Sequence, residues 1–126
     1  MSGYIFFAEL IPSPPILNDT AWLTQVLNEL GRVSTCPIIG SDLDDPQVKT
    51  ISMQLDCEDT ADPEMLLTTA VEALQHAVTL AGTAMSSIVR IDAVHSDLLN
   101  DGISPEERDA HVIDLTDLYM QRQLSA

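Results

Sequence analysis

The chain has 126 residues, 45% of them hydrophobic, which is enough for one domain with a single core. Twenty acidic residues oppose five basic ones, and the formal net charge is −15 at pH 7. A negative field of this size repels phosphate backbones and anionic lipids. We therefore expect no nucleic-acid or membrane partner, and any protein partner should be basic.

The location that the sequence predicts is the cytoplasm. Residues 1–11 lack the basic segment and cleavage pattern of a secretory signal, and no run approaches the ~20 apolar residues that span a bilayer. In the expected sheet Cys36 and Cys57 lie roughly 20 Å apart, far beyond disulfide range. Both are therefore expected as free thiols, which fits a reducing compartment.

The first half of the chain predicts a strand, a helix and a second strand. Residues 4–11 form an apolar run rich in aromatic and β-branched side chains, which predicts a buried strand that ends at Pro12. A helix closing at Gly31 follows, and its apolar stripe consists of Trp22, Leu23, Val26, Leu27 and Leu30. Residues 33–39 read as a strand, but Pro37 cannot donate to a central ladder, so this strand should lie at an edge.

The second half predicts a strand, a helix and a strand. Residues 50–57 alternate strictly between apolar and polar side chains, as a strand with one buried face does. Asp62 and Pro63 are typical of a helix start, and Gly82 ends that helix. In the strand over residues 87–94, we expect the buried face to carry Val89, Ile91 and Ala93.

The C-terminal pattern allows two interpretations. Ser104 to Glu107 form a capping box, so a helix is expected to begin there and run to about Gln123. Residues 111–115 could instead be an extra strand before a short helix. The sequence favours the continuous helix.

Together these elements predict a ferredoxin-like βαββαβ fold. Four antiparallel strands in the order 4-1-3-2 would have both helices on one face, and the second strand would be an edge, as Pro37 requires. Residues 1–96 should form this α+β domain, with residues 97–126 packed on it as a mainly helical extension. The fold hosts many unrelated activities, so function must be argued from sites.

The common catalytic and metal-binding motifs are absent from the sequence. It contains no GxxxxGK[ST], GxGxxG, GxSxG, HExxH or CxxC, and the acidic turn after residue 41 fails the EF-hand pattern. His76, His95 and His111 show no spacing that suggests a shared metal. No catalytic residue, metal site or cofactor is therefore expected.

The side of the sheet that faces away from the helices, called the open sheet face below, is the first candidate site. If Tyr4, Phe6, Ala8 and Leu10 are buried, the outward residues include Glu9, Phe7, Gln54, Arg90 and Asp92. Carboxylates around an arginine beside an exposed phenylalanine could bind a polar ligand or a partner, and a homodimer could form through this face. The alternatives are a solvated face with one ion pair, or a face covered by the C-terminal segment.

A cluster of acidic side chains is the second candidate, called the acidic docking surface below. It consists of Asp42, Asp44, Asp45, Glu58 and Asp59. Negative charge of this density speeds encounter with a basic protein. The alternative is that these side chains only shape turns and keep the chain soluble.

These features favour a small acidic protein-binding module without catalytic activity, such as an inhibitor, an immunity-type protein or an adaptor. One alternative is a ligand-binding regulatory domain that uses the open sheet face. A small α+β barrel enzyme using Glu9, Arg90 or a histidine is a further alternative, although nothing in the sequence places a nucleophile beside a base.

Overall fold

The computed structural model of the chain describes residues 2–14, 16, 20–58, 62–96, 106 and 111–125. Its elements, in chain order, are β1 (Ser2–Ser13), α1 (Thr20–Leu30), β2 (Thr35–Ser41), β3 (Lys49–Cys57), α2 (Pro63–Leu80), β4 (Ala84–His95), β5 (Ile113–Asp114) and α5 (Thr116–Ser125). None of the described helices is both long and apolar enough to cross a membrane.

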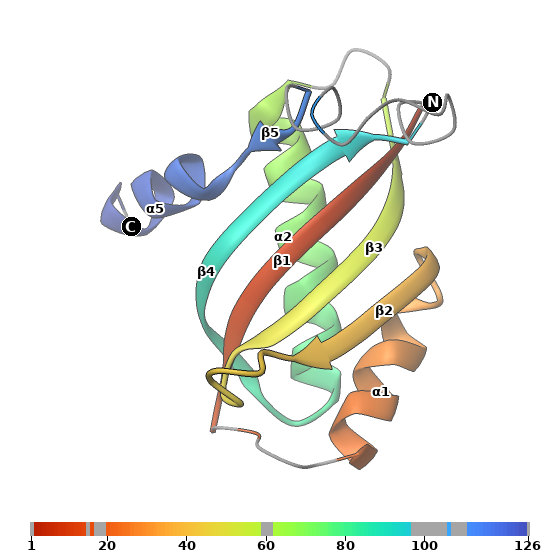
Figure 1. Cartoon of the computed structure of the whole chain (residues 1–126), viewed down its shortest axis with the longest axis vertical. Coiled ribbons are helices and arrows are strands. Elements are labelled where there is room, and N and C mark those ends of the chain that lie inside the picture. The colour runs from red at the N-terminus through yellow and green to blue at the C-terminus, as the bar shows by residue number, and fades with distance from the viewer. Residues whose placement is uncertain are drawn as a thin grey trace.

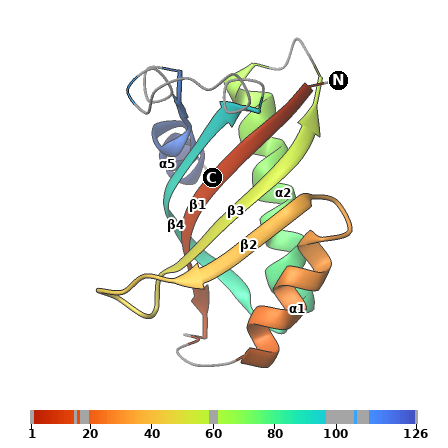
Figure 2. The same cartoon turned by 45° about the vertical axis from the view of Figure 1, so that its right-hand side comes forward.

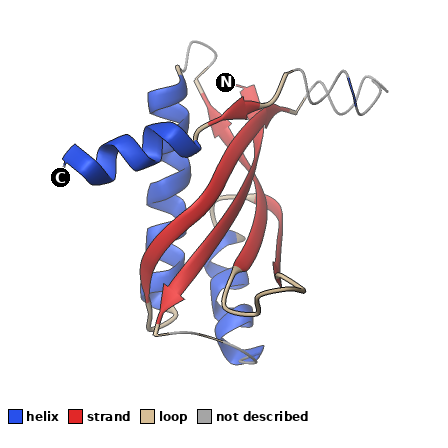
Figure 3. Ribbon diagram, turned by 60° about the vertical axis from the view of Figure 1, so that its left-hand side comes forward, coloured by secondary structure: helices blue, strands red, loops and turns tan. Residues whose placement is uncertain are grey.

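The strands form one antiparallel sheet in the order β2-β3-β1-β4-β5, with α1 and α2 on one face (Figure 1). Figure 3 shows the helices and the sheet as two layers. The predicted ferredoxin-like order 4-1-3-2 is confirmed, and β5 is added beyond β4. Pro37 lies on the edge strand β2, within a register shift between Thr35 and Ile38, where its missing N–H breaks no central ladder.

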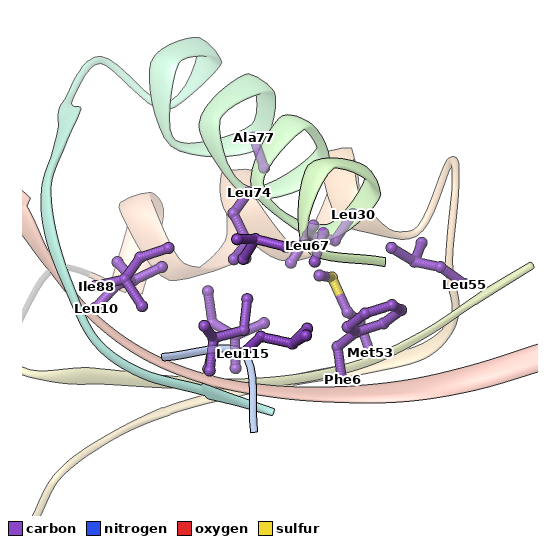
Figure 4. Packing of buried hydrophobic residues seen from close by; sticks show 14 of the residues in the cluster. Phe6, Leu10, Leu30, Met53, Leu55, Leu67, Leu74, Ala77, Ile88 and Leu115 are labelled. Carbon is purple, nitrogen blue, oxygen red and sulfur yellow. The ribbon is translucent and has the colours of Figure 1, made fainter. Parts of the chain in front are cut away.

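The core lies between the sheet and the two helices. Phe6, Ala8 and Leu10 of β1 are fully buried, as the alternation of that strand predicts, and Leu67 and Leu74 of α2 reach toward them (Figure 4). Burying each large apolar side chain stabilises the fold by about 1.5–3 kcal/mol.

Both ends of α2 carry the predicted signals. The Asp62 carboxylate accepts a hydrogen bond from the backbone N–H of Met65 at 2.9 Å, with Pro63 as the first helical residue. Gly82 follows the helix with a φ of 91°, which suits a residue without a side chain. Trp22 Nε1 of α1 donates to Thr83 Oγ1 at 3.0 Å, and this bond ties the two helices together at that end.

The buried face of β4 differs from the simple alternation that the sequence predicts. Glu9 pairs with Arg90, whereas Leu10 pairs with Ile88, so Val89 is an extra residue in a β-bulge. Ile88 is fully buried and Val89 is 44% exposed. The prediction that Val89 faces the core is therefore wrong, because the bulge reverses the alternation between residues 88 and 91.

The C-terminal segment joins the sheet before it becomes a helix. Ile113 pairs with Ala93 and Asp114 with Asp92, so the favoured continuous helix through residues 111–115 is wrong and the extra strand is the correct alternative. Leu115 is fully buried in the core, and burying it explains why the chain is extended here. The capping box at Ser104 to Glu107 lies outside the described residues except for residue 106.

Helix α5 docks on the helical side of the molecule, where Tyr119 enters the core cluster (Figure 3). Arg122 Nη2 donates to the Glu64 carbonyl oxygen at 2.9 Å, to Glu64 Oε2 at 2.8 Å and to Thr68 Oγ1 at 2.8 Å. These bonds hold α5 against the start of α2. Helix α5 therefore does not cover the open sheet face, which was one of the alternatives for the C-terminal segment.

Candidate ligand-binding site

A cleft of about 400 Å³ opens where the end of α1, the middle of α2 and the end of β3 meet. Figure 2 shows α1 and α2 on one side of the sheet that contains β3. The cleft is lined by Glu29, Val33, Leu55, Asp56, Thr69, Glu72, Ala73 and His76. This volume is within the range of pockets that hold small organic molecules, and such pockets combine apolar walls with a few polar groups.

The most unusual side chain in this cleft is that of Glu29, which is only 6% exposed. Its Oε1 accepts a hydrogen bond from Gln25 Nε2 at 3.3 Å, but its Oε2 has no hydrogen-bond partner among the described residues. Arg32 forms a long ion pair with Glu29: its Nε lies 3.7 Å from Oε2, and its side chain is 76% exposed. A buried carboxylate with a free oxygen is unfavourable unless another group completes its bonding.

The position of Glu29 in α1 makes it more unfavourable still. Glu29 lies in the last turn of the helix, where the backbone carbonyls carry partial negative charge, and that turn contains no basic residue. Sequence reasoning missed Glu29, although a signal was present. Val26, Glu29 and Leu30 share the buried face of α1, so an acid stands within an apolar stripe.

Other polar groups of the cleft come from α2 and β3. Glu72 and His76 are exposed on α2, and Asp56 is exposed on β3, on the face of that strand opposite to the buried Leu55. No local sequence pattern indicates that these residues and Glu29 line one cleft, because they come from three different elements. Among the described residues, no group of three or more histidine, cysteine or acidic side chains could hold a metal ion.

Cys57, the last residue of β3, is a buried free thiol. Burial raises the pKa of the Cys57 thiol, the charge of Asp56 raises it further, and a hydrogen bond with Thr69 opposes both effects. At neutral pH the thiol therefore stays protonated, which argues against a role as a nucleophile.

On the open sheet face, the structure brings three of the five predicted residues into contact. Arg90 Nη2 lies 2.9 Å from Asp92 Oδ2, and the Arg90 guanidinium lies 5.7 Å from the centroid of the Phe7 ring. Glu9 stands opposite Arg90 in the strand register, while Gln54 stands opposite Ile5. Burial raises the pKa of Asp92, and the neighbouring Arg90 opposes that rise.

The residues of the acidic docking surface do not form one patch. Asp42, Asp44 and Asp45 occupy the turn between β2 and β3, whereas Glu58 follows the far end of β3. The length of β3 separates them by roughly 25 Å at ~3.3 Å per residue. Asp59 lies outside the described residues.

The acidic residues of the turn between β2 and β3 have a structural role. Asp42 Oδ1 accepts hydrogen bonds from the backbone N–H groups of Asp44 at 2.8 Å and Asp45 at 3.3 Å. Lys49 is buried beside this turn, where its Nζ donates to Ser41 Oγ at 2.9 Å and to the Pro46 carbonyl oxygen at 2.7 Å. These bonds explain why this segment contains several acidic residues and a lysine.

The chain shows little similarity to known proteins. No family model matches the chain, and neither does any curated protein. Among solved structures, the chain is similar to one from Chloroflexus aurantiacus J-10-fl, described provisionally as an antibiotic biosynthesis monooxygenase. The two align over 75% of this chain and 92% of that chain, with 15% identity and a TM-score of 0.46. A likeness at this level does not carry that protein's activity over to this chain.

The predicted protein-binding module without catalytic activity, whether inhibitor, immunity-type protein or adaptor, is wrong. The acidic side chains on which that prediction rested lie at opposite ends of β3, and the structure shows instead a cleft lined by a buried carboxylate. The cleft fits the alternative prediction, a ligand-binding regulatory domain, better than it fits a protein-binding module. That prediction placed the ligand on the open sheet face, whereas the cleft with the unpartnered carboxylate lies on the helical side.

Proposed function

We propose that this chain is a ligand-binding domain that holds a small polar molecule in the cleft between α1, α2 and β3. One observation carries the proposal: the cleft of about 400 Å³ is lined by a carboxylate whose Oε2 has no hydrogen-bond partner among the described residues. Oε2 itself is closed to solvent in this structure, so a ligand that takes the place of Arg32 and donates to the Glu29 carboxylate would supply the missing bond.

The walls of the cleft are also suited to binding. Val33, Leu55 and Ala73 provide apolar contact, while Thr69 and His76 add groups that can donate or accept hydrogen bonds. A few polar groups among apolar walls orient a ligand and make binding selective.

A fragment screen followed by two-dimensional NMR tests this proposal. Binding fragments should shift the backbone signals of Glu29, Thr69 and His76 and leave those of the turn between β2 and β3 unchanged. Ala73→Leu should abolish these shifts because the added atoms fill the cleft. Gln75→Leu, on the exposed side of the same helix, is the matched control and should bind normally. A screen without hits, or hits that Ala73→Leu leaves unaffected, would refute the proposal.

We also propose a cytoplasmic location. The support is that Cys57 is a buried free thiol, because disulfides dominate in oxidising compartments. Cell fractionation of the tagged full-length chain tests this, and recovery in an oxidising compartment would contradict it.

We further propose that the chain forms a homodimer through the open sheet face. The support is that Ile5, Phe7 and Ile11 remain half-buried there without a covering element among the described residues. Sedimentation velocity should show a dimer that Phe7→Asp converts to a monomer. A wild-type chain that stays monomeric at high concentration would exclude the dimer.

A further inference from the structure

We infer that the ligand of this cleft is an organic cation, with a primary ammonium or guanidinium group placed against Glu29 Oε2. The inference rests on the proposed function and specifies its ligand class. It concerns the cleft as lined by the carboxylates of Glu29 and Glu72, with no lysine or arginine among the described lining residues.

The charge of the lining favours a cation. Glu29 is buried in this cleft and Glu72 is exposed at it, so the negative potential there adds to that of a chain with a net charge of −15. Arg32 pairs with Glu29, but the distance between Nε and Oε2 is long, at 3.7 Å, and the Arg32 side chain is 76% exposed. A ligand cation can therefore replace Arg32 without breaking a buried contact.

The end of α1 adds to this preference. Glu29 belongs to the last turn of the helix, where the free carbonyls favour positive charge, and the described turn supplies no basic side chain of its own. A cation at Oε2 would offset both the carboxylate and the helix terminus. An anion would be repelled by both the carboxylate and the helix terminus.

The geometry indicates an organic cation rather than a metal ion. Among the described residues, the acidic and histidine side chains do not converge as a metal site requires. The cleft is far larger than an ion, and Val33, Leu55 and Ala73 offer apolar surface to a carbon skeleton. An ammonium or guanidinium group with a short apolar body fits these features together.

Three ligands that share a phenylethyl body test the inference: 2-phenylethylammonium, 2-phenylethanol and 3-phenylpropanoate. Each is titrated into the full chain at constant ionic strength, and its Kd is read from NMR shifts of the cleft residues. The ammonium should bind at least about tenfold more tightly than the alcohol, as expected for a charge-assisted hydrogen bond, and the propanoate should bind most weakly.

Two variants separate local recognition from general attraction. Glu29→Gln should weaken ammonium binding about tenfold and leave alcohol binding unchanged. Asp44→Asn removes the same charge from the exposed turn between β2 and β3 and should leave both affinities unchanged. The NMR spectrum of each variant verifies that it is folded.

The outcomes distinguish the inference from the proposed function. If the alcohol or the propanoate binds as tightly as the ammonium, or if Asp44→Asn weakens ammonium binding as much as Glu29→Gln does, the cation inference is overturned and the cleft remains a ligand site. If none of the three ligands shifts the cleft signals while the fragment screen yields neutral or anionic hits there, the inference is again overturned. If the screen also yields nothing, the proposed function fails with it.

Discussion

Glu29 Oε2 and Arg32 Nε lie 3.7 Å apart at the end of α1, with the carboxylate buried and the guanidinium exposed to solvent. The two residues are one helical turn apart, yet their environments are opposite. Arg32 can leave the pair at little expense, whereas Glu29 is fixed by the packing of the buried face of α1. Glu29 is thus an acid held inside the protein by its neighbours and not by a strong counter-charge.

Replacing Glu29 should stabilise the free protein. Glu29→Gln removes a buried charge from the negative end of α1 and keeps the oxygen that accepts from Gln25. The free energy of unfolding should rise by about 0.5–1 kcal/mol, and Tm by about 2–5 °C. Thermal and urea unfolding measured by circular dichroism provide both values.

Asp44→Asn is the control for this stability effect, because it removes an equal charge from an exposed position in the turn between β2 and β3. Its effect should stay within about 0.5 kcal/mol. A Glu29→Gln variant that is less stable than the wild type would show that Glu29 contributes to the fold and is not retained for binding.

The bulge in β4 predicts opposite responses at two adjacent residues. Ile88→Ala removes a fully buried side chain and should lower the free energy of unfolding by about 2–4 kcal/mol. Val89→Ala trims a side chain that is 44% exposed and should change it by less than about 0.5 kcal/mol. Urea unfolding of the two variants decides between the bulge and simple alternation, which predicts the reverse order.

Arg122 should control the docking of α5. Arg122→Ala removes three hydrogen bonds to α2, which should destabilise α5 by about 1 kcal/mol and speed amide exchange there about fivefold. Gln123→Ala, at an exposed position of the same helix, should leave exchange unchanged. Equal exchange rates in wild type and Arg122→Ala would mean that Leu115 and Tyr119 alone hold the helix.

Asp92 should make stability fall as pH rises. Burial raises its pKa above 3.8, so between 3.8 and the raised value the native state holds a proton that the unfolded chain has lost. The stability that this proton provides is complete below 3.8 and is lost as pH rises through the raised pKa. Relative to Asp92→Asn, the wild type should therefore become less stable from about pH 3 to pH 7.

Asp114, opposite Asp92 in the register, should show the reverse trend. Its hydrogen bonds with Thr116 lower the pKa of its carboxyl group, so its contribution to stability is present above 3.8 and is lost as pH falls. Urea unfolding of wild type, Asp92→Asn and Asp114→Asn over this pH range checks both signs. If the free energies of unfolding of wild type and Asp92→Asn changed with pH in parallel, the pKa of Asp92 would not be raised.

Local patterns predicted most of the fold because each depends on neighbours in sequence. The alternation of β3, the Asp62–Pro63 start of α2 and the edge position required by Pro37 all follow from short-range chemistry. Val89 and the segment at Ile113 could not be predicted this way. A bulge and a late strand depend on which partner strand lies beside them, and the partner is not encoded locally.

The candidate site was harder to predict than the fold. Three of the five predicted residues on the open sheet face come together, because Phe7, Arg90 and Asp92 lie on two strands that the sequence predicts to be neighbours. The cleft instead depends on how α1, α2 and β3 meet in space. Only the acid within the apolar stripe of α1 gave a local sign of it.

A crystal structure of the full chain soaked with 2-phenylethylammonium tests the central claim most directly. We predict electron density for the ligand in the cleft, with its nitrogen within about 3 Å of Glu29 Oε2 and Arg32 turned into solvent. An empty cleft at saturating ligand concentration, with the Glu29 carboxylate rotated out to meet Arg32, would contradict the account.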